Sequence, residues 1–325
     1  EKTGEFRFYW DNKIFSLGMS ICLINITDSS QNITDLLHLP DAVCYRAKEE
    51  GRNGIIVDKQ FDGEILQRRR GEIEWITQIE SAFAQQRFML YQQPIHEVNV
   101  GKHSPVIGME ILLRMRDPDG KLISPDQFIP PAERYNLMSV IDRWVLRHTL
   151  KWLITHANDK AIPPLITINV SGASMVDPLF LEFALEQLQH TGITPNRICL
   201  EITETVAITN LSKARHFIAK LHDVGCRFAL DDFGSGMSSY GYLKDLPVDF
   251  LKIDGQFVQN LHLDPISLAM VRSIHEIGRL MGKRTIAEHI STPEGFALLK
   301  EIGVDYAQGH YLGKPEPLDD FLKST

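Results

Sequence analysis

The 325-residue sequence has few cysteines and no long apolar run. Cys22, Cys44, Cys199 and Cys226 form no CxxC pair and lie in or beside apolar segments, so we expect buried, reduced thiols and a cytoplasmic location. The longest apolar run, 14–26, is too short and too interrupted to cross a bilayer, and nothing resembles a signal peptide. We therefore expect no membrane contact by this chain, although an inner-membrane anchor in a longer parent protein is compatible with the sequence.

Positive charge is also scarce, because 34 Lys and Arg residues face 42 Asp and Glu residues and leave a formal net charge of −8. Proteins that bind DNA or RNA neutralise phosphates with basic surface, so we expect no nucleic-acid polymer as a partner. The basic run 68–70 is interpreted as a solvated face of a linker rather than a binding patch. The length and the hydrophobic share of 43% suit a globular protein with one large domain and a smaller piece, or with two domains.

A GxGxxG sequence after a first strand is missing, which argues against an open dinucleotide-binding sheet. From residue 88 onward, short apolar strands alternate with amphipathic helices, a pattern that predicts an α/β fold with a parallel sheet covered by helices. Eight such strands fit a closed, TIM-like β/α barrel, and an open doubly wound sheet is the alternative. The predicted strands are 88–91, 106–113, 165–170, 198–202, 228–230, 250–253, 285–287 and 306–307.

Polar residues lie at or near the carboxyl ends of nearly all these strands. In a β/α barrel those ends converge on one face, where barrel enzymes keep their active sites. Asp231 and Asp232 stand between a strand and a Gly-rich loop, where both can turn toward one site, although a helix cap is the simpler alternative. The residues concerned are Glu110, Asn169, Glu201, Glu204, Asp231, Asp232, Lys252, Glu288 and Gln308.

This set of residues predicts a metal site. Converging carboxylates repel one another, so they need a cation. Oxygen ligands without His or Cys favour Mg²⁺ or Mn²⁺ over Zn²⁺. Two such ions, about 3.5–4 Å apart, form the usual clamp for in-line attack on a phosphodiester. The residues alone therefore predict metal-assisted hydrolysis of a phosphate ester.

Seven short motifs occur in order in the segment 80–325: EILLR at 110–114, INVS at 168–171, LEITE at 200–204, DDFGSG at 231–236, LKID at 251–254, AE at 287–288 and QG at 308–309. Together they resemble the EAL domain, the cyclic di-GMP phosphodiesterase family. The resemblance implies a modified TIM-like barrel and metal-dependent hydrolysis of cyclic di-GMP to linear pGpG in bacterial second-messenger signalling. Family members often pair near the Asp-Asp loop, so a homodimer is also expected.

The resemblance assigns a metal-binding role to six residues. One ion is expected on Glu110, Asn169, Glu201 and Asp231, and a second on Asp231, Asp232 and Glu288. Of these, Glu110 and Glu288 are also expected to be catalytic. Lys252 takes the family position that orients or deprotonates the attacking water. A base role for Lys252 requires a lowered pKa, and whether Lys252 or Glu288 accepts the proton stays open.

The resemblance also implies substrate contacts for Gln93, Arg114 and Gln308, and a loop-bracing role for Glu204 toward residues 231–239. The guanidinium fork of Arg114 suits a phosphate oxygen, and an ordinary surface salt bridge is the alternative. For Glu204 the alternative is a plain acid at a strand exit.

The sequence departs from the family pattern at a few positions. Ile111 replaces an alanine and is expected to face away from the metals. After Glu288 the family usually has Gly-Val-Glu, whereas this chain has His289-Ile290-Ser291. Neither His289 nor His310 takes a family ligand position. Because the expected metal positions are all filled, an active enzyme is favoured over a degenerate EAL module that binds cyclic di-GMP without cleaving it, or an unrelated metal-dependent barrel enzyme.

Residues 1–57 do not continue the alternation of strands and helices found from residue 88 onward. They predict a hairpin at 6–17, a strand at 20–24 and a helix at 33–51. The segment 41–53, DAVCYRAKEEGRN, resembles the C-terminal third of a GGDEF domain, but the signature motif is missing and no cyclase activity is assigned. An unrelated strand-and-helix extension is the alternative. Residues 58–79 are expected to form a helical linker to the EAL domain at 80–325.

Overall fold

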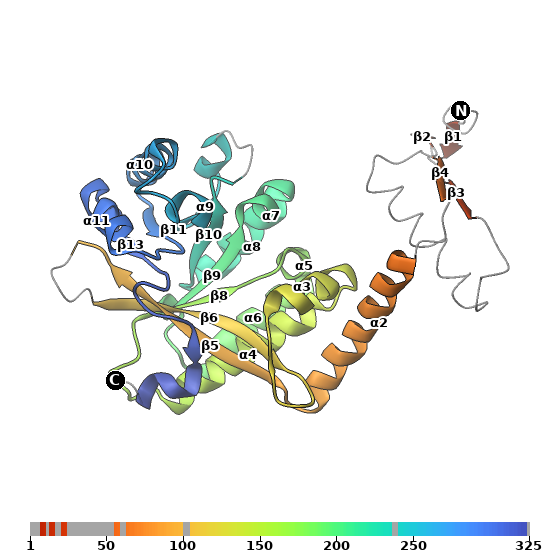
Figure 1. Ribbon diagram of the computed structural model, residues 1–325, viewed down its shortest axis with the longest axis horizontal. Coiled ribbons are helices and arrows are strands. Elements are labelled where there is room, and N and C mark those ends of the chain that lie inside the picture. The colour runs from red at the N-terminus through yellow and green to blue at the C-terminus, as the bar shows by residue number, and fades with distance from the viewer. Residues whose placement is uncertain are drawn as a thin grey trace. The chain divides into compact units, whose positions relative to one another are not determined.

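The computed structural model describes residues 7–10, 13–16, 21–24, 55–58, 63–99, 105–235 and 240–323. The chain divides into two compact units, Glu1–Glu80 and Ser81–Thr325 (Figure 1).

The described part of the first unit contains four short strands. Strand β1 (Arg7–Trp10) pairs antiparallel with β2 (Lys13–Ser16), as the predicted hairpin requires. Strand β3 (Ile21–Ile24) pairs parallel with β4 (Ile55–Asp58). The predicted helix at 33–51 lies outside the described residues. Helix α2 (Gly63–Ala84) covers the region where the linker helix was predicted.

The second unit is built around a closed barrel of eight strands. Seven strands run parallel in the order β6-β8-β9-β10-β11-β12-β13, and β5 closes the ring by pairing antiparallel with both β6 and β13. All eight predicted strands are confirmed, and closure excludes the open sheet. The strands are β5 (Phe88–Glu97), β6 (Val106–Arg116), β8 (Leu165–Asn169), β9 (Ile198–Thr203), β10 (Arg227–Phe233), β11 (Phe250–Ile253), β12 (Arg284–Ala287) and β13 (Tyr306–Ala307).

The antiparallel direction of β5 differs from the expected parallel sheet. Only eight residues separate Glu97 from Val106, too few for the helical crossover that parallel neighbours need, so the chain must turn back on itself. The short strands β7 (Leu122–Ile123) and β14 (Glu316–Pro317) extend the sheet beside β6 and β5.

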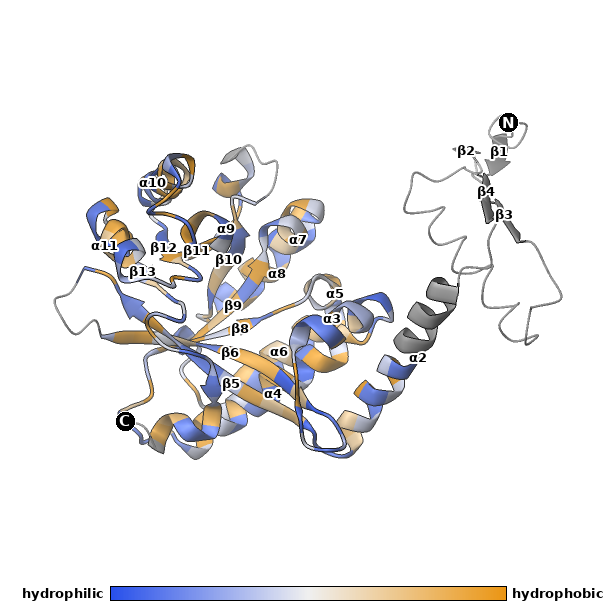
Figure 2. Cartoon of the chain, in the orientation of Figure 1, coloured by the Kyte–Doolittle hydropathy of each residue, from blue (hydrophilic) through white to orange (hydrophobic). Residues whose placement is uncertain are grey.

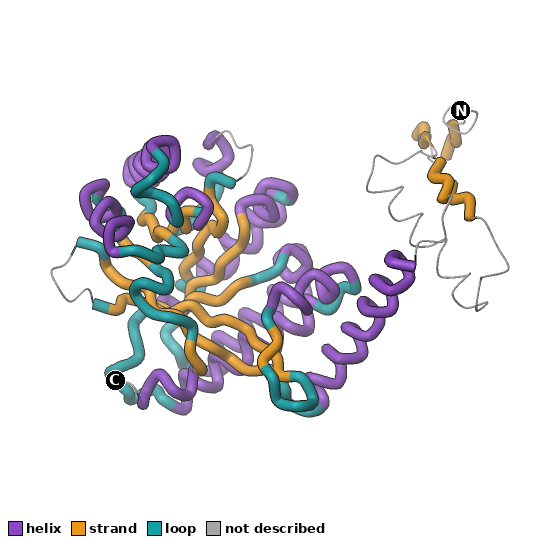
Figure 3. Tube along the Cα trace, in the orientation of Figure 1, coloured by secondary structure: helices purple, strands orange, loops and turns teal. Residues whose placement is uncertain are grey.

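Helices cover the outside of the barrel, as Figure 3 shows with helices in purple around the orange strands. Two of the longer ones have clear end signals: Asp264 caps α10 through two backbone N–H groups, and Gly303 ends α11 in the left-handed region. The helices are α3 (Pro125–Arg134), α4 (Met138–Thr155), α5 (Gly172–Val176), α6 (Pro178–Thr191), α7 (Glu204–Thr209), α8 (Leu211–Asp223), α9 (Gly255–Val258), α10 (Pro265–Leu280) and α11 (Pro293–Ile302).

The apolar residues concentrate in the barrel strands and on the inner sides of the helices (Figure 2). Among the described residues, no helix is both long enough and apolar enough to span a membrane.

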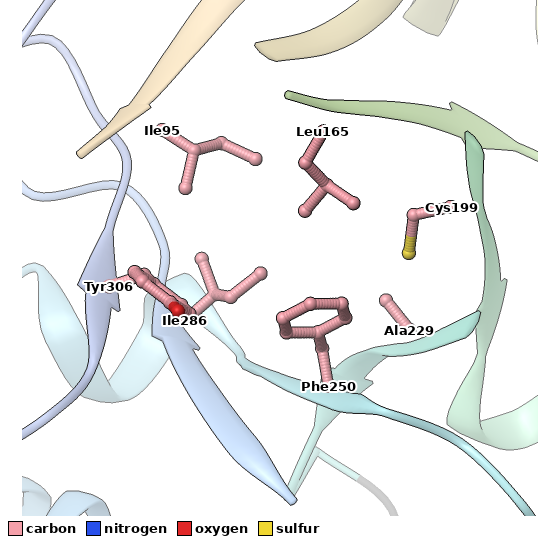
Figure 4. Packing of buried hydrophobic residues seen from close by; sticks show 7 residues of the cluster. All are labelled: Ile95, Leu165, Cys199, Ala229, Phe250, Ile286 and Tyr306. Atoms are coloured by element: carbon pink, nitrogen blue, oxygen red, sulfur yellow. The ribbon is translucent and has the colours of Figure 1, made fainter. Parts of the chain in front are cut away.

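Inside the barrel, seven strands each contribute one residue to an apolar cluster. The residues converge from all sides of the ring (Figure 4): Ile95, Leu165, Cys199, Ala229, Phe250, Ile286 and Tyr306. Cys199 and Cys226 are buried free thiols, as predicted, and burial raises the pKa of Cys226 to about 12. The side chains of Cys22 and Cys44 lie outside the described part of the chain.

Candidate active site

A polar layer lies next to this apolar cluster, toward the carboxyl ends of the parallel strands. Side chains two residues apart on a strand point to the same face. Two residues after Phe250 of the apolar cluster comes Lys252, and two residues after Tyr306 comes Gln308. On β5, which runs in the opposite direction, Gln93 comes two residues before Ile95. Glu110 on β6 is in register with Gln93 and Thr167 and belongs to the same layer, which consists of Gln93, Glu110, Thr167, Glu201, Asp231, Lys252, Glu288 and Gln308.

A bulge in β10 explains how two adjacent acids reach the same site. The register of β10 against β11 shifts between Leu230 and Phe233, so β10 has one extra residue there. The backbone accommodates this extra residue at Asp232, whose φ of 52° lies in the left-handed region. Instead of pointing to opposite faces, Asp231 and Asp232 both offer an oxygen to a group that includes Glu288, with these atoms within 4.8 Å of one another.

The ammonium group of Lys252 lies at the centre of the polar layer. Its Nζ is 2.7 Å from Glu201, 2.8 Å from Glu288, 3.0 Å from Asp231 and 3.6 Å from Glu110. The residue is only 1% exposed. A buried cation that neutralises several carboxylates explains how these acids can lie so close to one another.

Amide side chains hold Glu110 in place from two sides. Asn169 donates from Nδ2 to Oε1 of Glu110 at 2.7 Å, and Gln308 donates from Nε2 to Oε2 at 2.7 Å. Gln308 also donates to Oε1 of Gln93 at 3.1 Å. Gln93 in turn donates to the backbone oxygen of Gly313 at 2.8 Å. This chain of hydrogen bonds connects three strands and a loop, and it fixes the carboxylate of Glu110.

Burial and charge move the pKa values of the cluster in different directions. Burial raises the pKa of Glu201 to about 8 and that of Glu288 well above its usual value, and Lys252 only partly offsets this. For Glu110, Lys252 and the amide hydrogen bonds outweigh burial, so its pKa is lowered. Burial alone would lower the pKa of Lys252, but the four carboxylates, led by Asp231, raise it well above the ordinary value. This is opposite to the lowered pKa that a base role for Lys252 requires.

A cavity of about 930 Å³ opens onto this face. Glu110, Leu112 and Arg114 all line it, so β6 presents alternate residues to one face as predicted. The guanidinium carbon of Arg114 lies 5.4 Å from the ring centre of Tyr91, and its Nη1 donates to the backbone oxygen of Leu113 at 2.8 Å. Arg114 forms no ion pair with any described residue, so its charge faces the cavity.

Glu204 and the positions that depart from the family pattern lie in or next to the same site. Glu204 accepts a hydrogen bond from the backbone N–H of Gly234 at 2.9 Å and another from the hydroxyl of Tyr242. It thereby contacts both sides of the loop whose middle, 236–239, lies outside the described residues. Ile111 is 2% exposed and does not line the cavity, whereas His289, Ser291 and His310 do.

Asp142 on α4 is a buried acid that the motif-based prediction missed. Its Oδ2 accepts hydrogen bonds from the backbone N–H of Ser171 at 3.0 Å and from the Ser171 hydroxyl at 2.6 Å. Ser171 caps α5 and lies two residues after Asn169. The available signal was an acid between the apolar positions Ile141 and Val145 of an amphipathic helix. Burial raises the pKa of Asp142 to about 6.

This pKa predicts a pH-dependent contribution to stability. The folded value of about 6 lies above the ordinary value, so the folded state binds the proton more tightly and the stabilisation is lost as pH rises through about 6. Asp142→Asn stays neutral and keeps an acceptor for Ser171. Its unfolding free energy relative to wild type should therefore increase between about pH 4 and about pH 7, by up to about 3 kcal/mol. Urea unfolding at both pH values measures the change, and a difference that is constant with pH would contradict it.

The donor set fits divalent cations. Asp231, Asp232 and Glu288 supply three carboxylates close enough to share an ion. Oε1 of Glu201 is buried and accepts no hydrogen bond from any described residue, which leaves it available as a ligand. All these donors are oxygens, the type that Mg²⁺ and Mn²⁺ prefer.

Comparisons with known proteins agree with this geometry. The chain is 38% identical over 312 residues to "Cyclic di-GMP phosphodiesterase PdeB" of Shewanella oneidensis, a match that covers 95% of this chain and 36% of that protein. It is 31% identical over 331 residues to "Cyclic di-GMP phosphodiesterase PdeF" of Escherichia coli K12, with 98% and 42% covered. The chain thus spans less than half the length of these two relatives.

A solved structure described as "PaMucR Phosphodiesterase, c-di-GMP complex" matches with a TM-score of 0.71 at 30% identity, over 76% of this chain and 99% of that chain. The model of the EAL domain family matches residues 76–315, which include the whole barrel. The chain therefore belongs to the EAL domain family.

Proposed function

We propose that this chain hydrolyses cyclic di-GMP to linear pGpG with Mg²⁺ or Mn²⁺ as cofactor. The observation that carries the proposal is the acid-lined face, where four carboxylates lie within 3.6 Å of a single buried lysine and three of them, Glu110, Asp231 and Glu288, line the cavity. The barrel that carries this face is an EAL domain, and relatives with the same domain are named cyclic di-GMP phosphodiesterases.

Two metal ions would be held by the acidic face. We assign Glu110, Asn169, Glu201 and Asp231 to one ion and Asp231, Asp232 and Glu288 to the other. When bound, such ions lower the pKa of water and neutralise charge on the phosphoryl oxygens.

The remaining side chains are proposed to position the substrate. Arg114 lines the cavity with an unpaired charge, which suits a non-bridging phosphate oxygen. Gln93 and Gln308 fix Glu110 and present amides toward the same cavity. Lys252 is proposed to act as a cation that holds the carboxylates together and donates hydrogen bonds, since its surroundings oppose proton acceptance. Glu204 is proposed to brace the loop after Asp232 through its bond to Gly234.

The proposal predicts a metal-dependent product. Incubation with cyclic di-GMP and Mg²⁺ or Mn²⁺ should yield pGpG, and Glu110→Ala should reduce the rate at least a hundredfold because it removes a ligand and the partner of two amides. Chromatography of the products measures both. Glu182→Ala, which removes an exposed acid on α6, is the matched control. If the substrate binds but persists uncut in the wild type, the chain is a receptor and the proposal is wrong.

We propose that residues 1–57 correspond to the C-terminal part of a GGDEF-like domain, followed by a helical linker at 58–79 and the EAL domain at 80–325. Two observations support these boundaries: the family model begins at 76, and the compact units divide after Glu80. The matches to both relatives extend over at least 95% of the chain, so the N-terminal segment also has a counterpart in each of them. We propose a cytoplasmic location for this chain.

We also propose that the chain forms a homodimer next to the Asp-Asp loop. Leu263 and Ile266 are 73% and 74% exposed, just after Asn260, which lines the cavity. The double variant Leu263→Glu, Ile266→Glu should lower the fraction of dimer in sedimentation velocity at least tenfold, because charge in an apolar interface is not compensated. Leu280→Glu, at the other end of α10 and 79% exposed, is the control. A double variant that dimerises like the wild type contradicts this interface.

A further inference from the structure

His289 has a backbone conformation that is uncommon for residues other than glycine. Its φ is 55, in the left-handed region. Among the described residues, the other non-glycine residues with positive φ are Gln86, Asn136 and Asp232. Gln86 and Asn136 come two residues after the last residues of α2 and α3, where a left-handed residue is a common helix ending. The two that end no helix, Asp232 and His289, both line the cavity, and strain held at such a place points to function.

The ring of His289 packs closely against a glycine. A Cβ atom on Gly255 would lie 2.5 Å from Nδ1 and 2.7 Å from Cγ of His289, distances that real Cβ atoms do not show. Gly255 is buried, and its own φ is not left-handed, so close contact with the ring is what requires a glycine here. The ring therefore lies against the first residue of α9. The next turn of the chain brings Gln259 and Asn260 to the same cavity.

Backbone contacts hold His289 in this conformation. Ile290 donates its N–H to the backbone oxygen of Gln308 at 3.0 Å, and Tyr311 donates to the backbone oxygen of Ile290 at 3.1 Å. A Cβ on Gly309 would lie 2.2 Å from the backbone of Ile290, so the two segments touch. His289 is exposed to the cavity, and its ring makes no hydrogen bond to any described residue.

We propose that His289 is a substrate-contacting residue, whose imidazole donates or accepts a hydrogen bond with the nucleotide unit that lies between the acidic face and Asn260. The inference rests on the proposed hydrolysis of cyclic di-GMP and adds a specificity-determining residue to it. Three features of this position support the role. The backbone of His289 is strained, its ring packs against Gly255, and the ring has no hydrogen-bond partner among the described residues, so the imidazole is free to contact a ligand in the cavity.

Kinetics of four variants test this role. His289→Gly should raise KM for cyclic di-GMP about 3- to 10-fold and leave kcat within about twofold, as expected when one ground-state hydrogen bond is lost. Its thermal stability should not fall, because glycine adopts positive φ without strain. His289→Asn should recover part of the loss, since Asn tolerates this conformation and keeps a donor and an acceptor. Gly255→Ala should displace the ring and raise KM to a similar extent, and Gly278→Ala, a crowded glycine of α10 away from the cavity, is its control.

The KM of a double variant shows whether Gly255 acts through His289. If Gly255 acts through the ring, Gly255→Ala in the His289→Gly background should raise KM no further, a non-additive result. A wild-type KM in His289→Gly, with pGpG still produced, overturns the role of His289 and leaves the proposed function intact. A wild type that produces no pGpG overturns the proposed function itself. The His289 variants carry the test even where Gly255→Ala does not fold.

Discussion

Lys252→Met should destabilise the metal-free protein by about 3–5 kcal/mol, the usual cost of leaving buried charges without their partner. Lys252 is 1% exposed, and its four carboxylate neighbours have no other described cation within 4 Å. Without the ammonium group these carboxylates repel one another. Guanidinium-induced unfolding in the presence of a chelator measures the loss.

Mn²⁺ should restore much of this stability, because a cation that binds only the folded state stabilises it by mass action. The gain on adding Mn²⁺ should be larger for Lys252→Met than for the wild type, since the ion no longer competes with the ammonium group. Activity should nevertheless stay reduced by about a thousandfold, because the cation at the reacting centre is lost. Lys220→Met, an exposed lysine of α8, is the matched control. Equal stability of Lys252→Met and wild type without metal would show that the carboxylates do not depend on Lys252.

Asp231→Asn should abolish hydrolysis while leaving the barrel folded. Asp231 is the residue assigned to both ions, and it is also 3.0 Å from Lys252. Loss of metal-based charge stabilisation costs several kcal/mol in the transition state, which corresponds to a decrease in kcat of about a thousandfold or more. Stopped assays of pGpG formation under substrate saturation measure kcat directly.

The Asp232→Asn variant is the comparison for Asp231→Asn. Asp232 is exposed and assigned to only one ion, so Asp232→Asn should lose less activity, on the order of 10- to 100-fold. Dissociation constants for cyclic di-GMP should change little in either variant, because the lost interaction belongs to the transition state. If Asp232→Asn proved the more severe of the two, Asp231 would not be the shared ligand.

The barrel could be predicted from the sequence because its signals are local. Most strands are short apolar runs with a polar residue at or near the carboxyl end, as in Phe250–Ile253, and helices follow most of them. The antiparallel direction of β5 was missed because the predicted strand ended at residue 91, which left a connection to residue 106 long enough for a crossover, whereas β5 extends to Glu97. The closure of the ring through β5 also could not be predicted from local patterns. Strand pairing of this kind joins residues far apart in the chain, such as Ala307 and His96.

Most of the site could be predicted as a set of residues, but its internal geometry could not. The positions of Asp231 and Lys252 at strand ends, together with that of Glu110 within the predicted strand 106–113, predicted that these side chains meet. The bulge that turns Asp232 toward the site requires the register of β10 against β11, which no local pattern encodes. The raised pKa of Lys252 likewise results from four acids on different strands. The contact of His289 with Gly255 joins the loop after β12 to the start of α9, and nothing in the sequence relates these two segments.

Hydrolysis in ¹⁸O-labelled water tests the central claim most directly. Cyclic di-GMP is incubated with the protein and Mn²⁺ in labelled water, and the products are analysed by mass spectrometry. If the acid-lined face directs water to one phosphorus atom, the product is pGpG with a single ¹⁸O atom, located in its terminal 5′-phosphate, and the label is absent from the remaining phosphodiester. Bound cyclic di-GMP that stays uncut, or pGpG without label, would contradict the account.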